Sequence, residues 1–150
     1  MTGRPLERGA VRKDPGGRLR VALVYPNAWR LGMANLGLHA VYRVVNADPR
    51  ALCERVFLPE GPAEKVRSLE SGRPLADFDV VAFSLSFEED YGNVLALLDR
   101  AGLPVRAADR DGRFPLLVAG GIAVQMNPEP LAPFFDLFLV GEGEELLPPF

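Results

Sequence analysis

The sequence has very few of the side chains that hold metals or form disulfides. Its 150 residues include one cysteine, Cys53, and one histidine, His39. One thiol and one imidazole cannot form a disulfide or a four-ligand zinc site within a single chain. Cys53 begins a predicted strand and is expected to be a small core residue. His39 lies within a predicted helix, where a packing or surface role is expected.

Long apolar runs are also absent. No stretch approaches the roughly 18 consecutive apolar residues that suggest a membrane-spanning helix. The N-terminus has no apolar segment of the kind found in secretory signals. We therefore expect a cytoplasmic protein with no membrane partner.

Acidic residues outnumber basic ones, and the charges are unevenly spread. The net charge is −3. Residues 1–18 contain five basic and two acidic side chains, a surplus of +3, so the remainder carries −6. An acidic body disfavours nucleic acid as a partner of this domain. Because residues 1–18 are also rich in glycine and proline, we expect a flexible basic leader there and one α/β domain over residues 19–150.

Apolar runs and helical patterns alternate along the chain. Short apolar runs predict strands at residues 19–25, 53–58, 80–86, 116–119 and 137–140, with a short extra strand at 103–108. Helices are expected at residues 34–46, 63–70 and 88–101. This order predicts an α/β fold with an open, mostly parallel, five-stranded sheet and helices on both faces, flavodoxin-like or Rossmann-like. Residues 80–86 should be central, and residues 53–58 should lie near an edge.

Four loops should open at the carboxyl ends of these strands: residues 26–33, 84–90, 120–127 and 141–144. Open parallel sheets bind their ligands at this edge. The loops offer backbone without side chains at Gly120 and Gly121, hydroxyls at Ser84 and Ser86, and the flat side chain of Trp29. Such an edge suits a large, flat ligand with peripheral amides. A closed scaffold whose loops simply turn is an equally weighted alternative.

Several known site types need residues that these loops lack. A phosphoacceptor receiver needs a lysine after its fifth strand, but the only lysines are Lys13 and Lys65. No G-x-G-x-x-G fingerprint follows the first strand, and there is no P-loop. Glu142, Glu144 and Glu145 offer carboxylates for a cation, but acidic residues at a helix start also complement its free N–H groups, and we favour that interpretation. No nucleophile–base pair stands out, so no catalytic residue is assigned.

Three stretches carry a family resemblance: VYPNAWRLGMANLG at residues 24–37, DFDVVAFSLSFEEDYGNVL at 77–95 and AGGIAVQMNPEPLAPFFDLFLVGEGEE at 119–145. They resemble the N-terminal, cobalamin-binding-like domain of radical S-adenosylmethionine proteins of the iron–sulfur oxidoreductase type. The resemblance covers roughly residues 19–145. The third stretch, with its Gly-Gly, Pro-Glu-Pro and Gly-Glu-Gly-Glu elements, is the most specific part.

The resemblance implies that cobalamin binds at the loops named above. In cobalamin-dependent methyltransferases and mutases, an Asp-x-His-x-x-Gly loop supplies the histidine that binds cobalt. Residues 27–32 have this spacing, with Asn27 for aspartate, Trp29 for histidine and Gly32 matching. We expect the indole either to pack against the lower face of the cofactor or to fill its space. The expected contact residues are Asn27, Trp29, Gly32, Ser84, Ser86, Gly120, Gly121, Gly141 and Glu142.

The resemblance also implies a second domain. The radical chemistry of the family needs a Cys-x-x-x-Cys-x-x-Cys set that holds a four-iron cluster, to which S-adenosylmethionine binds. This chain has one cysteine. We therefore expect the 4Fe-4S cluster and S-adenosylmethionine in a C-terminal radical domain beyond residue 150, and no enzyme activity from this chain alone. The expected whole is a radical enzyme of unknown substrate, performing methyl transfer or related chemistry.

Two alternatives remain open. The chain is alternatively a cofactor-free module that docks on the radical domain or presents its substrate. More weakly, it is a flavodoxin-like domain for a flavin or a nucleotide. Under the cobalamin hypothesis, valine at both Gly120 and Gly121 should abolish cofactor uptake and leave the fold intact.

Overall fold

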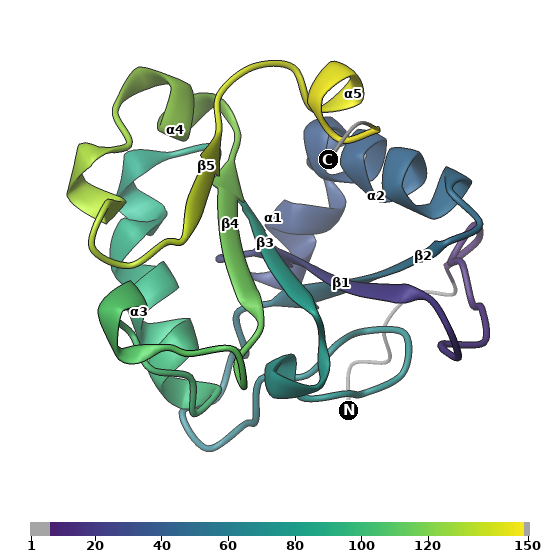
Figure 1. Ribbon diagram of the computed structural model, residues 1–150, viewed down its shortest axis with the longest axis horizontal. Helices are drawn as coiled ribbons and strands as arrows, with labels where there is room; N and C mark the ends of the chain where they lie inside the picture. The colour runs from purple at the N-terminus through teal and green to yellow at the C-terminus, as the bar shows by residue number, and fades with distance from the viewer. Residues whose placement is uncertain (1–6, 149–150) are drawn as a thin grey trace.

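The structure, a computed structural model, describes residues 7–148 and contains one parallel β-sheet (Figure 1). Its five strands lie in the order β2-β1-β3-β4-β5, and every neighbouring pair is parallel. The α/β class is confirmed, with β3 at the centre and β2 at one edge as predicted. The strands are β1 (Leu19–Tyr25), β2 (Ala51–Phe57), β3 (Val80–Ser84), β4 (Leu116–Gly120) and β5 (Leu137–Leu139).

Helices cover both faces of the sheet (Figure 1). One face packs against α3 (Tyr91–Arg100) and α4 (Ile122–Met126) in the larger apolar core. The other face packs against α1 (Trp29–Met33) and α2 (Leu36–Ala47). A short helix, α5 (Gly143–Leu146), follows β5 and contacts α2. Single 3₁₀ turns lie at Leu75–Asp77, Glu88–Asp90, Ala107–Asp109 and Glu129–Leu131. Within residues 7–148, no helix has both the length and the apolar character needed to cross a membrane.

The helix predicted at residues 34–46 begins later than expected, and a separate helix precedes it. Asn35 is the N-cap of α2: its side-chain oxygen accepts a hydrogen bond from the N–H of Leu38 at 2.8 Å. Asn35 has an extended backbone, so it separates α2 from the helical turn that precedes it. That preceding turn is α1, formed by residues 29–33, which were predicted as a loop.

Two other predicted elements are wrong. Residues 63–70 form no helix; Ser68 makes an isolated bridge to Val56, and the N–H of Leu69 donates to the carbonyl of Arg55 at 2.7 Å. This segment covers the free edge of β2, and edge pairing overrides local helix propensity. Residues 103–108 form no strand, because Arg110 binds the carbonyls of Pro104 and Val105, and the chain then enters a 3₁₀ turn.

Residues 7–18 contact the domain near the end of α2. The N–H of Val11 donates to the hydroxyl of Tyr42 at 2.8 Å. The ammonium of Lys13 donates to the carbonyls of Asn46, Asp48 and Ala51 at 2.7, 3.1 and 2.9 Å. A lysine suits the unpaired carbonyls at a helix C-terminus. The remainder of the predicted leader, residues 1–6, lies outside the described residues.

Arg55 on β2 is the largest of the fully buried side chains, with 1% of its surface exposed. Its guanidinium binds Glu70 at 2.7 Å and Glu7 at 2.5 Å, and it lies 4.4 Å from the centre of the Tyr42 ring. Burial works against its charge, but the hydrogen bonds and charges of Glu7 and Glu70 outweigh burial and raise the pKa of Arg55. The ion pair thus joins the N-terminal segment to the edge strand.

We predict that Arg55→Ala strongly destabilises the fold. It leaves Glu70, which has 4% of its side chain exposed, buried without a counter-charge. Removing one partner of a buried pair costs about 3–5 kcal/mol. Urea denaturation at neutral pH measures the loss. The control is Arg50→Ala, which removes an 83% exposed side chain paired with Asp48 and should change stability little. Equal losses in the two variants would contradict the prediction.

Candidate functional site

A cavity of about 410 Å³ lies at the carboxyl ends of β3, β4 and β5. We call the loops and helix starts at the carboxyl ends of the strands the rim, and this space the rim cavity. The register aligns Ser84 at the end of β3 with Gly120 at the end of β4, so both reach the rim together. Side chains on the α2 side of the sheet form the floor: Leu23, Ala82, Val118 and Leu139. The walls come from α2, α4 and α5.

Glycines keep the rim cavity open. Five of them line it: Gly37, Gly120, Gly121, Gly141 and Gly143. A Cβ on Gly120 would meet no atom closer than the carbonyl oxygen of Leu139, at 3.4 Å. That is ordinary contact, so the backbone tolerates a side chain there. A larger side chain at Gly120 would therefore occupy the cavity without disturbing the strand.

Gly121 has a different role, because the fold itself requires it. Its φ of 107° and ψ of 175° lie in a region that only glycine visits readily. A Cβ on Gly121 would lie 2.4 Å from the carbonyl oxygen of Leu85. The same oxygen accepts a hydrogen bond from the N–H of Ala123 at 3.1 Å, which begins α4 beside the β3 loop. The expectation that valine at both Gly120 and Gly121 leaves the fold intact is therefore wrong at Gly121.

Three side-chain amides connect neighbouring rim loops. Asn27 donates to a carboxylate oxygen of Asp90 at 2.7 Å. Asn35 donates to the hydroxyl of Ser86 at 3.1 Å, and Gln125 donates to the carbonyl of Gly141 at 3.0 Å. Asn35 and Gln125 also line the rim cavity, but neither was predicted from the sequence. Asn35 could have been found from its position as a helix N-cap, whereas no local sequence pattern marks Gln125.

The structure brings six of the nine predicted contact residues to the rim cavity: Ser84, Ser86, Gly120, Gly121, Gly141 and Glu142. Asn27, Trp29 and Gly32 do not line it. A Cβ on Gly32 would lie 2.2 Å from the ring of Phe57, so this glycine allows close packing of α1 on the sheet. Asn27 reaches Asp90, which is 3% exposed and whose second carboxylate oxygen has no partner among residues 7–148. Ligand binding by any of the nine stays a prediction.

Trp29 lies against a different cavity, of about 440 Å³, beside the N-terminal segment. Its neighbours there include Glu7, Arg55 and Glu70. The indole N–H is buried and has no hydrogen-bond partner among the described residues. The indole is not among the residues that line the rim cavity.

The chemistry of the rim cavity is acidic and amide-rich. Among residues 7–148, no histidine, cysteine, methionine, lysine or arginine lines it, whereas Glu142 and Glu144 do. Across residues 7–148, no group of three or more His, Cys, Asp or Glu side chains is placed to hold a metal ion. Cys53 is a core residue as predicted; burial raises the pKa of its thiol. His39 on α2 contacts the carbonyl of Met33 at 2.8 Å.

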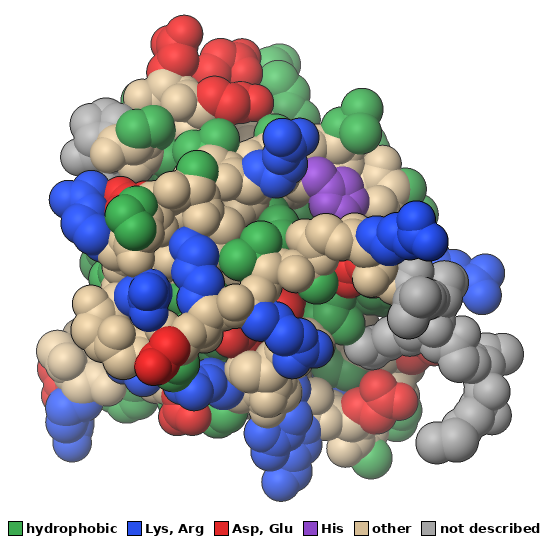
Figure 2. Space-filling view, turned by 90° about the vertical axis from the view of Figure 1, so that its right-hand side faces the viewer, with side chains coloured by type: hydrophobic (Ala, Val, Ile, Leu, Met, Phe, Trp, Pro, Cys, Tyr) green, Lys and Arg blue, Asp and Glu red, His purple; other side chains and the backbone are tan. Residues whose placement is uncertain are grey.

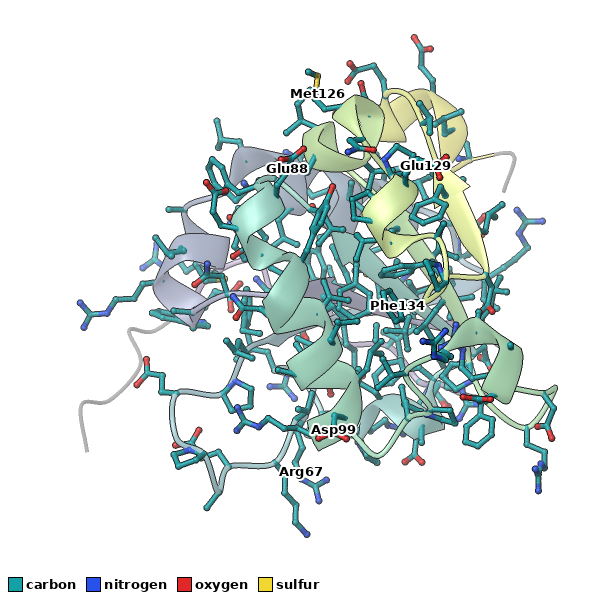
Figure 3. The ribbon with its side chains drawn as sticks, turned by 90° about the vertical axis from the view of Figure 1, so that its left-hand side faces the viewer. Arg67, Glu88, Asp99, Met126, Glu129 and Phe134 are labelled. Atoms are coloured by element: carbon teal, nitrogen blue, oxygen red, sulfur yellow. The ribbon has the colours of Figure 1, made fainter. Side chains whose placement is uncertain are left out.

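Acidic, basic and apolar side chains occupy different parts of the molecular surface. Figure 2 shows acidic side chains at the α5 end and many Lys and Arg side chains on the flank below it. The rim also exposes six large apolar side chains: Leu31, Leu36, Phe87, Ile122, Met126 and Val140. Met126 on α4 and Glu88 before α3 lie at this end of the molecule (Figure 3). An apolar rim around an acidic, glycine-lined cavity is the candidate site.

Comparison with known proteins identifies the family of the chain. Residues 37–150 match the model of a family described as radical SAM proteins, N-terminal. The chain belongs to this family. It is 28% identical over 130 residues to an uncharacterized protein of Methanocaldococcus jannaschii, an alignment that covers 83% of this chain and 24% of the relative. The chain thus spans about a quarter of that relative's length. No solved structure matches it.

We predict opposite outcomes for alanine at two adjacent glycines of this radical SAM N-terminal domain. Gly121→Ala forces a Cβ into the backbone of Leu85 at a φ of 107° and should cost about 3 kcal/mol or more. Gly120→Ala meets only ordinary contacts, so its cost should stay below about 1 kcal/mol. Urea denaturation followed by circular dichroism measures both. A Gly121→Ala variant as stable as Gly120→Ala would show that the two loops are not in contact.

Proposed function

We propose that the rim cavity holds a corrinoid, cobalamin, for a radical domain elsewhere in the longer protein. The observation that carries this proposal is the glycine-lined rim cavity of about 410 Å³ at the carboxyl ends of β3, β4 and β5. Ligand pockets of about 300–1,000 Å³ with apolar walls and few polar groups are typical of cofactor sites.

The residues present fit a corrinoid that is held without a protein ligand to cobalt. Among residues 7–148, no imidazole, thiol or thioether lines the cavity, so no described nitrogen or sulfur side chain is placed to bind cobalt. Asn35, Ser84 and Gln125 offer hydrogen bonds to peripheral amides, and Gly120 allows close backbone approach. The carboxylates of Glu142 and Glu144 disfavour a phosphate-rich ligand at the mouth. When bound, cobalamin supplies methyl-group transfer, and this chain would position it and limit access of water.

The radical chemistry is assigned to the part of the protein that this chain does not contain. With one cysteine, the chain cannot supply the three thiolates of a 4Fe-4S cluster. We propose that the cluster and S-adenosylmethionine are bound by a C-terminal radical domain and that the rim faces it. Membership in the N-terminal family and the greater length of the relative support this arrangement.

Titration with hydroxocobalamin tests the corrinoid proposal. We expect saturable binding with a spectrum that lacks a protein nitrogen ligand. Gly120→Val should fill the cavity and weaken binding about tenfold or more. The matched control is Gly92→Val on α3, where a Cβ meets nothing within 4 Å; it should bind as the parent does. Absence of binding to both the isolated chain and the full-length protein would reject the proposal, and a flavin bound in the purified chain would favour the flavodoxin-like alternative.

A second function, docking, is favoured by the exposed apolar side chains of the rim. Leu36 is 83% exposed, Met126 75% and Phe87 59%, although each belongs to a side-chain type that is usually buried. Concentrated around one cavity, such residues mark an interaction surface. In the cofactor-free alternative, this surface docks on the radical domain or presents its substrate, and the cavity holds no cofactor.

A paired substitution in the full-length protein tests docking. Phe87→Glu with Met126→Glu should loosen the rim from the remainder and speed limited proteolysis between the two parts, since charge disfavours an apolar interface. Leu116→Glu is the control, because that side chain is 41% exposed at the start of β4, away from the rim. Equal proteolysis rates in all three proteins would argue against a docked rim.

A further inference from the structure

The two faces of the sheet are covered unequally. On the α3 and α4 side, the core includes Phe83, Leu117 and Phe135, all at most 4% exposed. On the opposite side, α2 packs over β1 and β2, while Ala82 on β3 and Leu139 on β5 are only partly buried. An open parallel sheet normally has both faces covered along its whole width. We call the open part of the second face the face groove.

The face groove, with a volume of about 640 Å³, is almost entirely apolar. It runs from the rim to the amino ends of the strands and is lined by side chains such as Val44, Val80, Ala82, Val118 and Leu139. Its charged residues lie at its ends: Glu144 on α5, and Asp48 and Arg50, which pair with each other at 2.6 Å. Small-molecule sites carry precisely placed polar groups. The middle of this groove offers none, so it suits a packed apolar element.

The described chain enters this groove at its end. After β5, the chain turns at Gly141, whose φ is 141°, and α5 crosses over α2 near Val41. Leu147 and Pro148 then line the face groove. A segment that continues in this direction runs back along the sheet, antiparallel to the strands, as the helix after a parallel strand does. The family match reaches residue 150, and the relative is about four times as long as its aligned part.

We propose that the segment following Phe150 in the longer protein forms a helix in the face groove, with its apolar stripe on the partly buried Ala82 and Leu139. A helix of about 11 residues spans the roughly 17 Å of the five-residue strands β3 and β4. This helix also closes the side of the rim cavity opposite α2. The assignment does not depend on the ligand, so it stands or fails separately from corrinoid binding.

Thiol labelling of single cysteines in the full-length protein tests the proposal. Ala82→Cys and Val44→Cys place thiols in the face groove, and Arg113→Cys places one on a side chain that is 81% exposed elsewhere. Labelling is read by mass spectrometry of the peptides. We expect residues 82 and 44 to react about tenfold or more slowly than residue 113. Cys53, which is 0% exposed, reports global unfolding in every variant.

Chains of three lengths identify the occupant. The isolated chain (residues 1–150) should label rapidly at residue 82, and a chain extended by about 25 residues should already protect it. Residue 113 should react alike in all three. Rapid labelling of residue 82 in the full-length protein overturns the proposal. So does protection that appears in the full-length protein but not in the extended chain, because a remote part would then cover the groove. Protection in an isolated chain that sediments as a dimer assigns the groove to a second copy.

Discussion

The close approach of Gly121 to the backbone of Leu85 is the constraint on which the rim depends. Leu85 donates its N–H to the carbonyl of Gly120 and accepts from the N–H of Ala123, so the β3 loop and the start of α4 are joined at one point. Only a residue without Cβ permits this contact. It sets where α4 begins, and therefore where Gln125 meets Gly141. The two adjacent glycines therefore have different roles. Gly121 allows the β3 loop and α4 to approach each other, and Gly120 leaves the cavity beside them open.

The unequal cover of the sheet explains why the cavity lies where it does. The α3 and α4 side is closed by a continuous apolar core. On the α2 side, α2 packs mainly over β1 and β2, and Ala82 and Leu139 are only partly buried. The rim cavity is the part of that partly open face at the carboxyl ends of the strands. A site for a large flat ligand and a groove for an apolar helix therefore share one origin, a sheet that is wider than the helices described on this face.

The N-terminal segment packs against the edge strand β2. Arg55, Glu70 and Glu7 meet beside Trp29, away from the rim cavity. Residues 27–32 have the spacing of a cobalt-ligand loop, but this arrangement places Trp29 at a different cavity from the rim cavity. The loop turns into α1, which points the indole toward β2 and the N-terminal segment. Sequence spacing indicates which loop follows β1, but the direction of a side chain in that loop depends on what the loop packs against.

The sequence by itself determined the order of the five strands, the parallel sheet and the central place of β3. Apolar periodicity is local, and parallel connections obey strong rules of handedness, so these features follow from short windows of sequence. Family membership was also readable, from the glycine and proline spacing of residues 119–145 and two further stretches. The tertiary structure alone decided that residues 63–70 cover an edge strand, that Asn35 reaches Ser86 51 residues away, and which predicted contacts share one cavity. Those outcomes depend on groups that are distant in the chain, and no local pattern encodes which of them will meet.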